Sequence, residues 1–340
     1  MTRLSILVRV VRGPIVESWH RFQLAAVTPD GALEAATDSP DVVTTFRSAA
    51  KPFQLLPFVE RGHAERFGFD DEAVAVMSAS HTGSARHLEL VRGILERIGQ
   101  PADALRCGFH EPLDPSSLAE LRANPSLRSP LYNNCSGKHA GMLAMCVAEG
   151  WPVAGYTSPS HPLQQLIRRT MGEVTGRDPA SLLLAVDGCS VPVFGLPLSG
   201  MARAYARLAA ARPAGDARER ALARIREAMM RFPAATGGAG RFSTALMEAT
   251  PGRLVAKGGA EGLECVGVPA NALGLAIKCE DGAARGVGPA TVAALEALGL
   301  LRAAERTALE TFARPVVTNH AGLEVGAIEA AVSVAAGAAR

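Results

Sequence analysis

The chain has 340 residues, of which 48% are hydrophobic and 20% charged, and its formal net charge is +2. This length and apolar content can bury a large core, whereas the near balance of charge excludes nucleic acid as a main partner, because phosphate binding needs a concentrated basic face. Every apolar stretch is interrupted by charged residues, Gly or Pro before it could span a bilayer, so we expect no membrane partner.

The N-terminal third predicts two strands followed by helices. Residues 4–11 and 22–31 are strand-like, and the second strand closes in a Pro-Asp-Gly turn. Residues 50–62 predict a short helix, and residues 87–99 have helical periodicity with a glycine stop. The short apolar run at residues 71–80 fits either a strand or a helix.

Helices and strands continue to alternate through the rest of the chain. The segments that predict helices are residues 140–150, 161–176, 198–211 and 217–232. The segments that predict strands are residues 181–192, 253–263, 274–282 and 284–288. This mixture predicts an α/β or α+β layered fold. We expect one domain over residues 1–330, with two lobes as the alternative, and a frayed tail over residues 331–340 because that segment is Ala-rich and lacks caps.

The N-terminal segment and the cysteines favour a cytoplasmic location. Arg9 interrupts the apolar start of the chain and no small-residue cleavage site follows, so we expect no signal peptide. The six cysteines are scattered through a long chain, and without a secretory signal we expect reduced thiols that are mostly buried.

The segment RSAAK places Ser48 three residues before Lys51, and on a helix this spacing puts both side chains on one face. A lysine whose pKa is lowered can take the proton of a serine, and Ser-x-x-Lys is the arrangement of β-lactamases and penicillin-binding proteins. As a bare pattern it is weak, and capping or a solvated pair is the commoner role.

Two later segments strengthen this interpretation. Ser80 ends an apolar run, and Lys257 begins a Lys-Gly-Gly segment after a strand-like run. Such a strand can bring a second amine beside Ser80, with glycines that let a substrate approach the backbone, whereas the alternative is a simple Gly258-Gly259 hairpin turn. Together with Ser48 and Lys51, these residues predict a double Ser–Lys set.

A second group of reactive residues lies in NNCSGKH and in VDGCS. Cys135 and Lys138 are three residues apart at the start of a predicted helix, where a thiol has a lowered pKa. Asp187 and Cys189 lie in a turn after a predicted strand. Two thiolates with nitrogen or oxygen donors suit Zn²⁺, but the spacing is not that of a zinc finger and, by itself, favours buried structural cysteines.

Five ordered segments make the chain recognisable: RSAAKPFQL, SASHTG, YNNCSGKHAGMLAM, DGCSVPVFGLPL and VAKGGAEG. Together they resemble the asparaginase II family, the Rhizobium etli type of L-asparaginase. The resemblance implies hydrolysis of L-asparagine to L-aspartate and ammonia. It also implies an αβα sandwich similar to serine β-lactamases and glutaminases, with helices on both sides of a sheet, and a homodimer.

The resemblance assigns roles to individual residues. It implies two catalytic Ser–Lys tandems, Ser48 with Lys51 and Ser80 with Lys257. It implies zinc as a cofactor, held by three ligands: Cys135, Lys138 and Cys189. This implication reverses the preference for buried structural cysteines that spacing alone gave.

Three further residues are expected to bind substrate. Asp187 would lie beside the zinc and hydrogen-bond water or substrate. Arg47 can pair with the substrate α-carboxylate, or form a surface ion pair, and His139 either binds substrate or packs.

Other functions fit the same residues. A glutaminase or a β-lactamase-like serine hydrolase would use the same Ser–Lys pairs, and a catalytically silent amino-acid-binding protein would keep only the fold. The four intact Ser and Lys residues count against the silent protein. The sequence departs from the family pattern at four positions: Ser190, Ser84, Phe232 and Ser243. Ser190 stands where Gly is usual.

Overall fold

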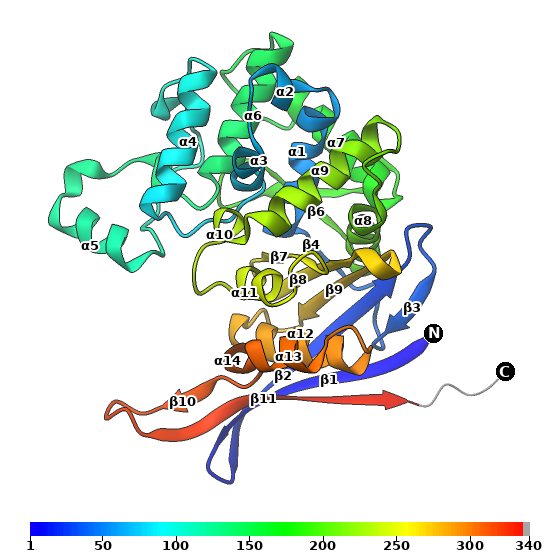
Figure 1. The fold of residues 1–340 in the computed structure, drawn as a ribbon. Helices are drawn as coiled ribbons and strands as arrows, with labels where there is room; N and C mark the ends of the chain where they lie inside the picture. Colours follow the sequence, from blue (N-terminus) through cyan, green and yellow to red (C-terminus); the bar gives the residue numbers. More distant parts are fainter. Residues whose placement is uncertain (336–340) are drawn as a thin grey trace. The chain divides into compact units, whose positions relative to one another are not determined.

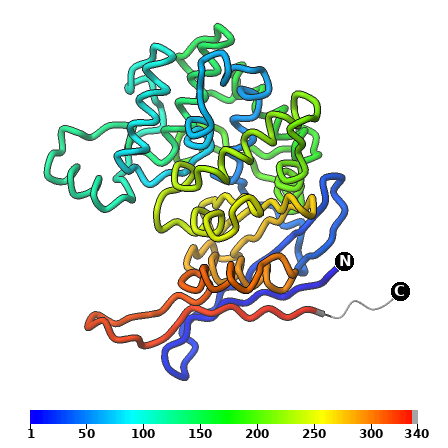
Figure 2. The backbone as a smooth tube through the Cα atoms, viewed as in Figure 1, coloured from blue at the N-terminus to red at the C-terminus, as the bar shows by residue number. Residues whose placement is uncertain are grey.

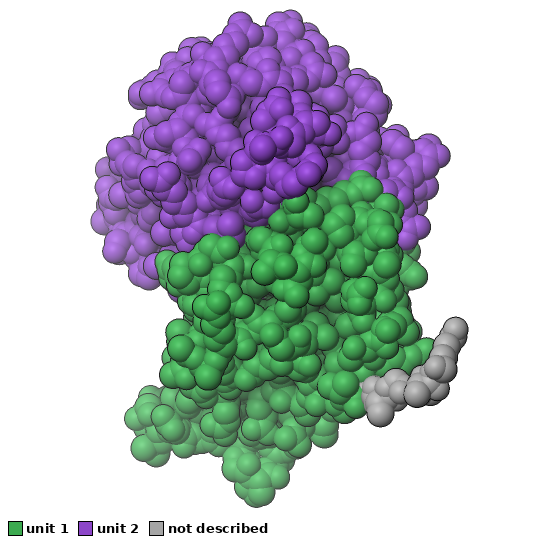
Figure 3. All heavy atoms as spheres, turned by 45° about the vertical axis from the view of Figure 1, so that its right-hand side comes forward, with its two compact units in different colours: residues 1–49, 196–210, 245–340 green, residues 50–195, 211–244 purple. Residues whose placement is uncertain are grey.

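The computed structural model describes residues 1–335 (Figure 1). The chain forms two compact units, which are coloured separately in Figure 3. Unit 1 consists of residues 1–49, 196–210 and 245 onward, and unit 2 consists of residues 50–195 and 211–244. The single domain expected over residues 1–330 stays a prediction. Residues 1–335 include no helix with the length and apolar character that crossing a bilayer requires.

Unit 1 contains an eight-stranded mixed sheet with the strand order β10-β11-β1-β3-β2-β9-β8-β7. Its strands are β1 (Thr2–Arg12), β2 (Ile15–Val27), β3 (Leu33–Ala36), β7 (Val255–Gly259), β8 (Leu263–Val268), β9 (Leu273–Cys279), β10 (Val316–Thr318) and β11 (Glu324–Ala335). The sheet is mixed because β1 pairs in parallel with β3 but antiparallel with β2 and β11. Together with the helices it makes the mixed α/β fold that the sequence predicts.

The two ends of the described chain lie side by side in this sheet (Figure 2). β1 alternates buried and more exposed positions, with Leu4, Ile6, Val8 and Val10 on the buried side, as a strand with one face on a core should. β11 pairs antiparallel with β1 from Gly326 to Ala335. Residues 331–335 of the expected tail are therefore strand, and residues 336–340 lie outside the described residues.

Two helices of unit 1 pack on this sheet, α8 (Leu198–Ala210) and α12 (Val287–Ala297). α14 (Glu310–Ala313) packs against α12 and against α13 (Ala303–Ala308), while α11 (Phe242–Ala249) crosses into the unit. α8 packs against β2, β8 and β9. It comes so close that a Cβ at Gly274 would lie 2.0 Å from the carbonyl oxygen of Ala202.

The strand expected at residues 284–288 is wrong. These residues form a 3₁₀ turn, Ala284–Gly286, and the first turn of α12. The segment is a short run of small residues in which no period of either kind can be read, so neighbouring packing decides its conformation.

Unit 2 is mainly helical. Its helices are α1 (Lys51–Glu60), α2 (His63–Arg66), α3 (Asp71–Met77), α4 (Ala85–Arg97), α5 (Pro115–Ala123), α6 (Ser136–Glu149), α7 (Pro162–Thr175), α9 (Ala217–Arg231) and α10 (Pro233–Thr236). A short β4 (Val43–Thr45) precedes the unit, and β5 (Leu183–Val186) pairs antiparallel with β6 (Pro192–Pro197). The ambiguous residues 71–80 begin as a helix, α3, because the Asp70 carboxylate caps it by accepting from Ala73 N–H.

α6 carries the motif-rich segment and runs through the core of unit 2. Its first eleven residues are all buried, and it ends at Gly150, whose φ of 68° gives the left-handed C-terminal cap that glycine favours. Gly137 allows α6 to touch α3, because a Cβ there would lie 2.2 Å from the Val76 carbonyl oxygen. The small residue thus sets where the end of α3 meets the start of α6.

Candidate active site

Lys51 is a buried amine at the first position of α1, with 1% of its surface exposed. Its Nζ lies 2.6 Å from the Ala79 carbonyl oxygen, 2.8 Å from Ser80 Oγ and 3.5 Å from the Asn134 carbonyl oxygen. Burial is the main cause that lowers the pKa of Lys51. A neutral amine here can donate to the two carbonyls and still offer its lone pair to the Ser80 hydroxyl proton.

Ser80 is held in place by its backbone. Its N–H donates to the Thr236 carbonyl oxygen at 3.1 Å, and the next N–H, of His81, donates to the Asn134 carbonyl oxygen at 3.2 Å. The segment after α3 is therefore fixed between α10 and the residues that precede α6. This backbone support orients the Ser80 hydroxyl toward Lys51.

The two asparagines before Cys135 build the turn that begins α6. The Asn133 side chain donates to the Cys107 carbonyl oxygen at 2.8 Å and accepts from Cys135 N–H at 2.9 Å. The Asn134 carbonyl oxygen serves both Lys51 and His81. Both asparagines belong to the NNCSGKH segment, but no role was predicted for them. The type of a side chain does not indicate what its backbone carbonyl will bind.

The buried His81 adds a further contact between the same segments. Gly83 N–H donates to His81 Nδ1 at 3.1 Å, so the ring proton is on Nε2, which lies 2.9 Å from Ser136 Oγ. The Ser136 hydroxyl in turn donates to the Leu131 carbonyl oxygen at 2.9 Å. This chain of hydrogen bonds ties the Ser80 segment to the first turn of α6.

Cys135, Lys138 and Cys189 form a second buried group in unit 2. Lys138 Nζ lies 2.8 Å from Cys189 Sγ. A hydrogen bond with Cys189 lowers the pKa of Cys135, assisted by the charges of Lys51 and Lys138, while the same bond raises the pKa of Cys189. Burial opposes the charge on Lys138, but the two cysteines outweigh it and raise the pKa of that amine.

Cys189 is presented by a tight turn between β5 and β6. Asp187 N–H donates to the Val191 carbonyl oxygen, and Ser190 N–H donates to the Asp187 carbonyl oxygen, both at 2.9 Å. Cys189 Sγ lies 3.6 Å from Asp187 Oδ2. Ser190 adopts φ 73°, a left-handed conformation that favours glycine.

Three of the expected residues lie in unit 1: Arg47, Ser48 and Lys257. Ser48 belongs to the 3₁₀ turn Arg47–Ala50, in which Arg47 has φ 43°. Arg47 Nη1 forms a long ion pair, 3.9 Å, with Glu261 Oε1. Lys257 is buried in β7, and its Nζ donates to the Gly258 carbonyl oxygen at 2.9 Å.

The hairpin-turn alternative for the two glycines after Lys257 is wrong. Gly258 and Gly259 belong to β7 and pair with Glu264 and Leu263 of β8, and the turn follows them at residues 260–262.

The sequence profile of the L-asparaginase II family matches residues 8–330. The chain belongs to the L-asparaginase II family. Membership implies L-asparaginase activity, an amidohydrolase reaction. Among curated proteins, none matches the chain.

Among solved structures, the chain is similar to that of a protein proposed to be a beta-lactamase from Bacteroides dorei. The identity is 9%, the TM-score is 0.36, and the match covers 86% of this chain and 93% of the other. The expected αβα sandwich stays a prediction.

For an L-asparaginase II chain, the cysteine group fits the expected zinc ion. Two thiols and an amine are donors that Zn²⁺ accepts, and the Cys189 sulfur is within contact distance of Lys138 while it hydrogen-bonds Cys135. A zinc ion would displace the Lys138 proton. The zinc site itself stays a prediction.

His139 is buried beside Tyr156 in unit 2 of this L-asparaginase II chain. Arg106 N–H donates to the Tyr156 hydroxyl at 2.9 Å, and that hydroxyl lies 2.6 Å from His139 Nδ1. The other ring nitrogen, Nε2, is buried and has no hydrogen-bond partner among the described residues. No role was predicted for Tyr156 from the sequence.

Proposed function

We propose that this protein hydrolyses L-asparagine to L-aspartate and ammonia through an acyl-enzyme on serine. The observation that carries the proposal is the buried Lys51, whose amine has a lowered pKa and lies 2.8 Å from Ser80 Oγ. A lysine whose pKa is lowered is a better general base near neutral pH than an ordinary surface lysine. Family membership supplies the substrate class.

In the proposed reaction, Ser48 Oγ attacks the side-chain amide carbon of asparagine and Lys51 takes its proton. Ser80 and Lys257 relay a proton to the departing ammonia, and the bond between the carbonyl carbon and nitrogen breaks. A water then attacks the acyl-serine, its proton returns through the same lysines, and L-aspartate leaves. Atoms balance with one water consumed and one ammonia released.

The substrate-binding residues and the metal complete the proposal. Arg47 pairs with the α-carboxylate in place of its long pair with Glu261, and Asp187 and His139 bind substrate polar groups. Cys135, Lys138 and Cys189 would hold zinc, which supplies a positive charge beside Asp187 when bound. The proposed assembly is a homodimer, which sedimentation velocity measures.

Ser80 is the competing nucleophile, and the Lys51–Ser80 hydrogen bond favours it. Ser48→Ala and Ser80→Ala separate the two. With Ser48 as nucleophile, Ser48→Ala lowers kcat for ammonia release by roughly 10³-fold or more, while Ser80→Ala retains a slow acyl transfer. Acid quenching during turnover, followed by peptide mass spectrometry, shows which serine carries the acyl group.

The same assay tests the other functions. Ammonia release from glutamine at a rate equal to that from asparagine would favour a glutaminase, and cleavage of a chromogenic β-lactam without ammonia release would favour a β-lactamase-like hydrolase. Calorimetric binding of asparagine without ammonia release would identify a silent binding protein. Full activity in both serine variants contradicts the acyl-enzyme itself.

A further inference from the structure

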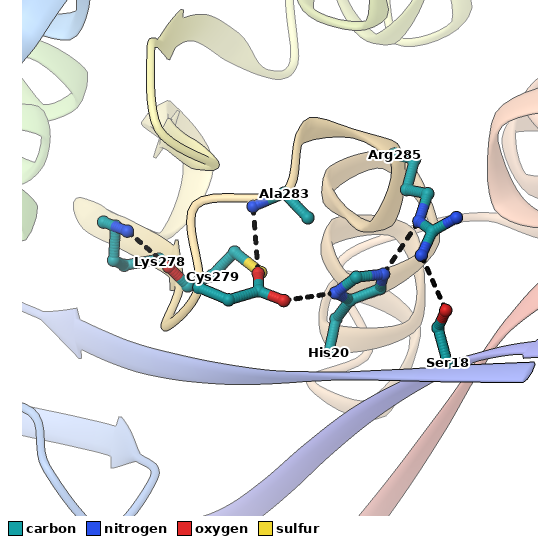
Figure 4. A network of polar contacts seen from close by, with 7 residues as sticks. Ser18, His20, Lys278, Cys279, Ala283 and Arg285 are labelled. Atoms are coloured by element: carbon teal, nitrogen blue, oxygen red, sulfur yellow. Dashed lines mark hydrogen bonds and ion pairs between the residues drawn. The ribbon is translucent and has the colours of Figure 1, made fainter.

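A second group of metal-ligating side chains lies in unit 1, on the sheet. His20 is on β2 and Cys279 ends β9 (Figure 4). Asp281 follows in the turn after β9. β2 and β9 are antiparallel neighbours, with Phe22 opposite Cys279, so the turn after β9 folds back onto the His20 side chain. One ligand atom from each of the three residues lies within 4.8 Å of the other two.

Asp281 is the shared acceptor at the centre of this group. Its Oδ2 lies 2.7 Å from His20 Nδ1, and its Oδ1 lies 2.8 Å from Cys279 Sγ. Ala283 N–H donates to Oδ1 at 2.9 Å, which fixes the carboxylate in the turn. The nitrogen, sulfur and oxygen atoms therefore converge on one point from two strands and a rigid turn.

Arg285 determines the tautomer of His20. Its Nε donates to His20 Nε2 at 2.9 Å, and its Nη2 donates to Ser18 Oγ at 2.8 Å. A ring nitrogen that accepts a hydrogen bond carries no proton, so the His20 proton is on Nδ1 and is directed at Asp281. Figure 4 shows Arg285 over the outer edge of the ring, on the side away from Cys279.

We propose that His20, Cys279 and Asp281 form a binding site for a divalent cation of the zinc class, and that Arg285 limits its affinity. One imidazole, one thiolate and one carboxylate are a borderline donor set that suits Zn²⁺ or Co²⁺ and not the hard cations Mg²⁺ or Ca²⁺. Three protein ligands leave the fourth tetrahedral position open. The half-exposed Asp281 side chain gives the ion a route from solvent.

Binding changes the protonation of two ligands. The Cys279 thiol loses its proton to solvent as the metal–sulfur bond forms. The His20 proton moves from Nδ1 to Nε2, so that Nδ1 can bind the metal, and one proton is released in total. Arg285 Nε must then leave Nε2, because a nitrogen that carries a proton cannot accept its hydrogen bond.

The metal-free group is already satisfied by its own hydrogen bonds, so the fold does not depend on the ion. The site is also distinct from the Cys135, Lys138 and Cys189 group, which belongs to unit 2. Cys279 N–H donates to the Gly262 carbonyl oxygen at 2.8 Å, in the turn that follows β7 and Lys257. An ion at this group would therefore stiffen the end of that strand pair.

Equilibrium dialysis of the full chain against Zn²⁺, with metal analysis, counts the sites. The wild type is expected to bind one equivalent of Zn²⁺ more than either the Cys279→Ser or the Asp281→Asn variant. Asp281→Asn changes a half-exposed residue and should keep the fold. Cys265→Ala, which removes another buried thiol of the sheet, keeps the extra equivalent. Equal metal content in the wild type and in both ligand variants overturns the proposal.

Cobalt and Arg285 supply the second test. In a Cys135→Ser/Cys189→Ser chain, Co²⁺ should still give a thiolate charge-transfer band, and Cys279→Ser should remove it. Arg285→Ala should tighten Co²⁺ binding by roughly tenfold, the size typical of groups that contact ligands but not the ion. A band that persists without Cys279 overturns the site, and unchanged affinity in Arg285→Ala overturns the role of Arg285.

Discussion

Lys51 Nζ and Ser80 Oγ lie 2.8 Å apart, and both residues are buried. The sequence spacing pairs Lys51 with Ser48, three residues earlier, and the resemblance pairs Ser80 with Lys257. The hydrogen bond joins one member of each expected tandem. In the proposed reaction Lys51 takes the proton of Ser48, and the hydrogen bond makes it the base for Ser80 if Ser80 is the nucleophile. A single substitution at Lys51 therefore tests the base for either choice of nucleophile.

Lys51→Gln should lower kcat for asparagine hydrolysis by about 10²–10⁴-fold, the range for loss of a general base. The glutamine amide can still donate to the Ala79 carbonyl oxygen but cannot take up a proton. Lys278→Gln, at a lysine of β9 with no role in the proposed reaction, is the matched control and should stay near wild-type activity. Steady-state ammonia release measures both, and a Lys51→Gln loss of less than tenfold would remove Lys51 as the base.

Ser190→Gly should stabilise the protein. Ser190 is exposed and has φ 73°, a left-handed conformation that favours glycine. Left-handed backbone costs a non-glycine residue about 1–2 kcal/mol, and the larger entropy of an unfolded glycine offsets part of the gain. We expect the free energy of unfolding in urea to rise by about 0.5–1 kcal/mol.

Ser190→Ala is the control for that change, because alanine keeps the Cβ that makes this conformation costly. It should give no gain in stability. A stabilisation by Ala equal to that by Gly would show that the serine hydroxyl, and not the backbone, is responsible.

The sequence predicted α1, α4, α6, α7, α8 and α9 because their periodicity and stop signals are local, but it did not predict α12. Gly150 and Gly176 end α6 and α7 as expected. It did not predict β11, because that strand exists through its pairing with β1, more than 300 positions away. An Ala-rich segment carries little local preference for such a partner.

The candidate site divides in the same way. The side chains with reactive groups were predicted from their types and from the resemblance, and the structure brings Lys51 to Ser80 and Lys138 to Cys189. The supporting groups were not predicted: the Ala79 and Asn134 carbonyl oxygens and the Tyr156 hydroxyl. Backbone atoms are the same in every residue, so only the fold reveals which of them face Lys51.

Gly137→Ala should destabilise the protein by about 2 kcal/mol or more, because its Cβ would lie 2.2 Å from the Val76 carbonyl oxygen and backbone must move to relieve the clash. It should also lower activity, since the shift displaces α6 from the segment that carries Ser80. Gly93→Ala in α4 is the matched control, because its Cβ meets no atom within 4 Å. Chemical denaturation should show the control gaining about 0.5–1 kcal/mol from helix propensity.

The buried His81 should make the protein acid-sensitive. Burial lowers its pKa well below the ordinary value, with added effects from the stacked His87, from Lys51 and from His110. The unfolded chain then binds more protons than the folded chain between the folded pKa and about 6.5, so stability is complete above about 6.5 and falls as the pH decreases. The pKa of His87 is lowered by burial as well, so it contributes with the same sign.

Urea unfolding at pH 7.5, 6.5 and 5.5 measures this slope, which is at most about 1.4 kcal/mol per pH unit for each histidine. His81→Gln keeps a donor and an acceptor in the side chain but does not titrate, so its slope below pH 6.5 should be shallower even where its stability at pH 7.5 is lower. Equal slopes in wild type and His81→Gln would contradict the prediction, because they would mean that His81 is protonated alike in the folded and unfolded chains. Its burial and the hydrogen bond from Gly83 N–H to Nδ1 are the reasons to expect a difference.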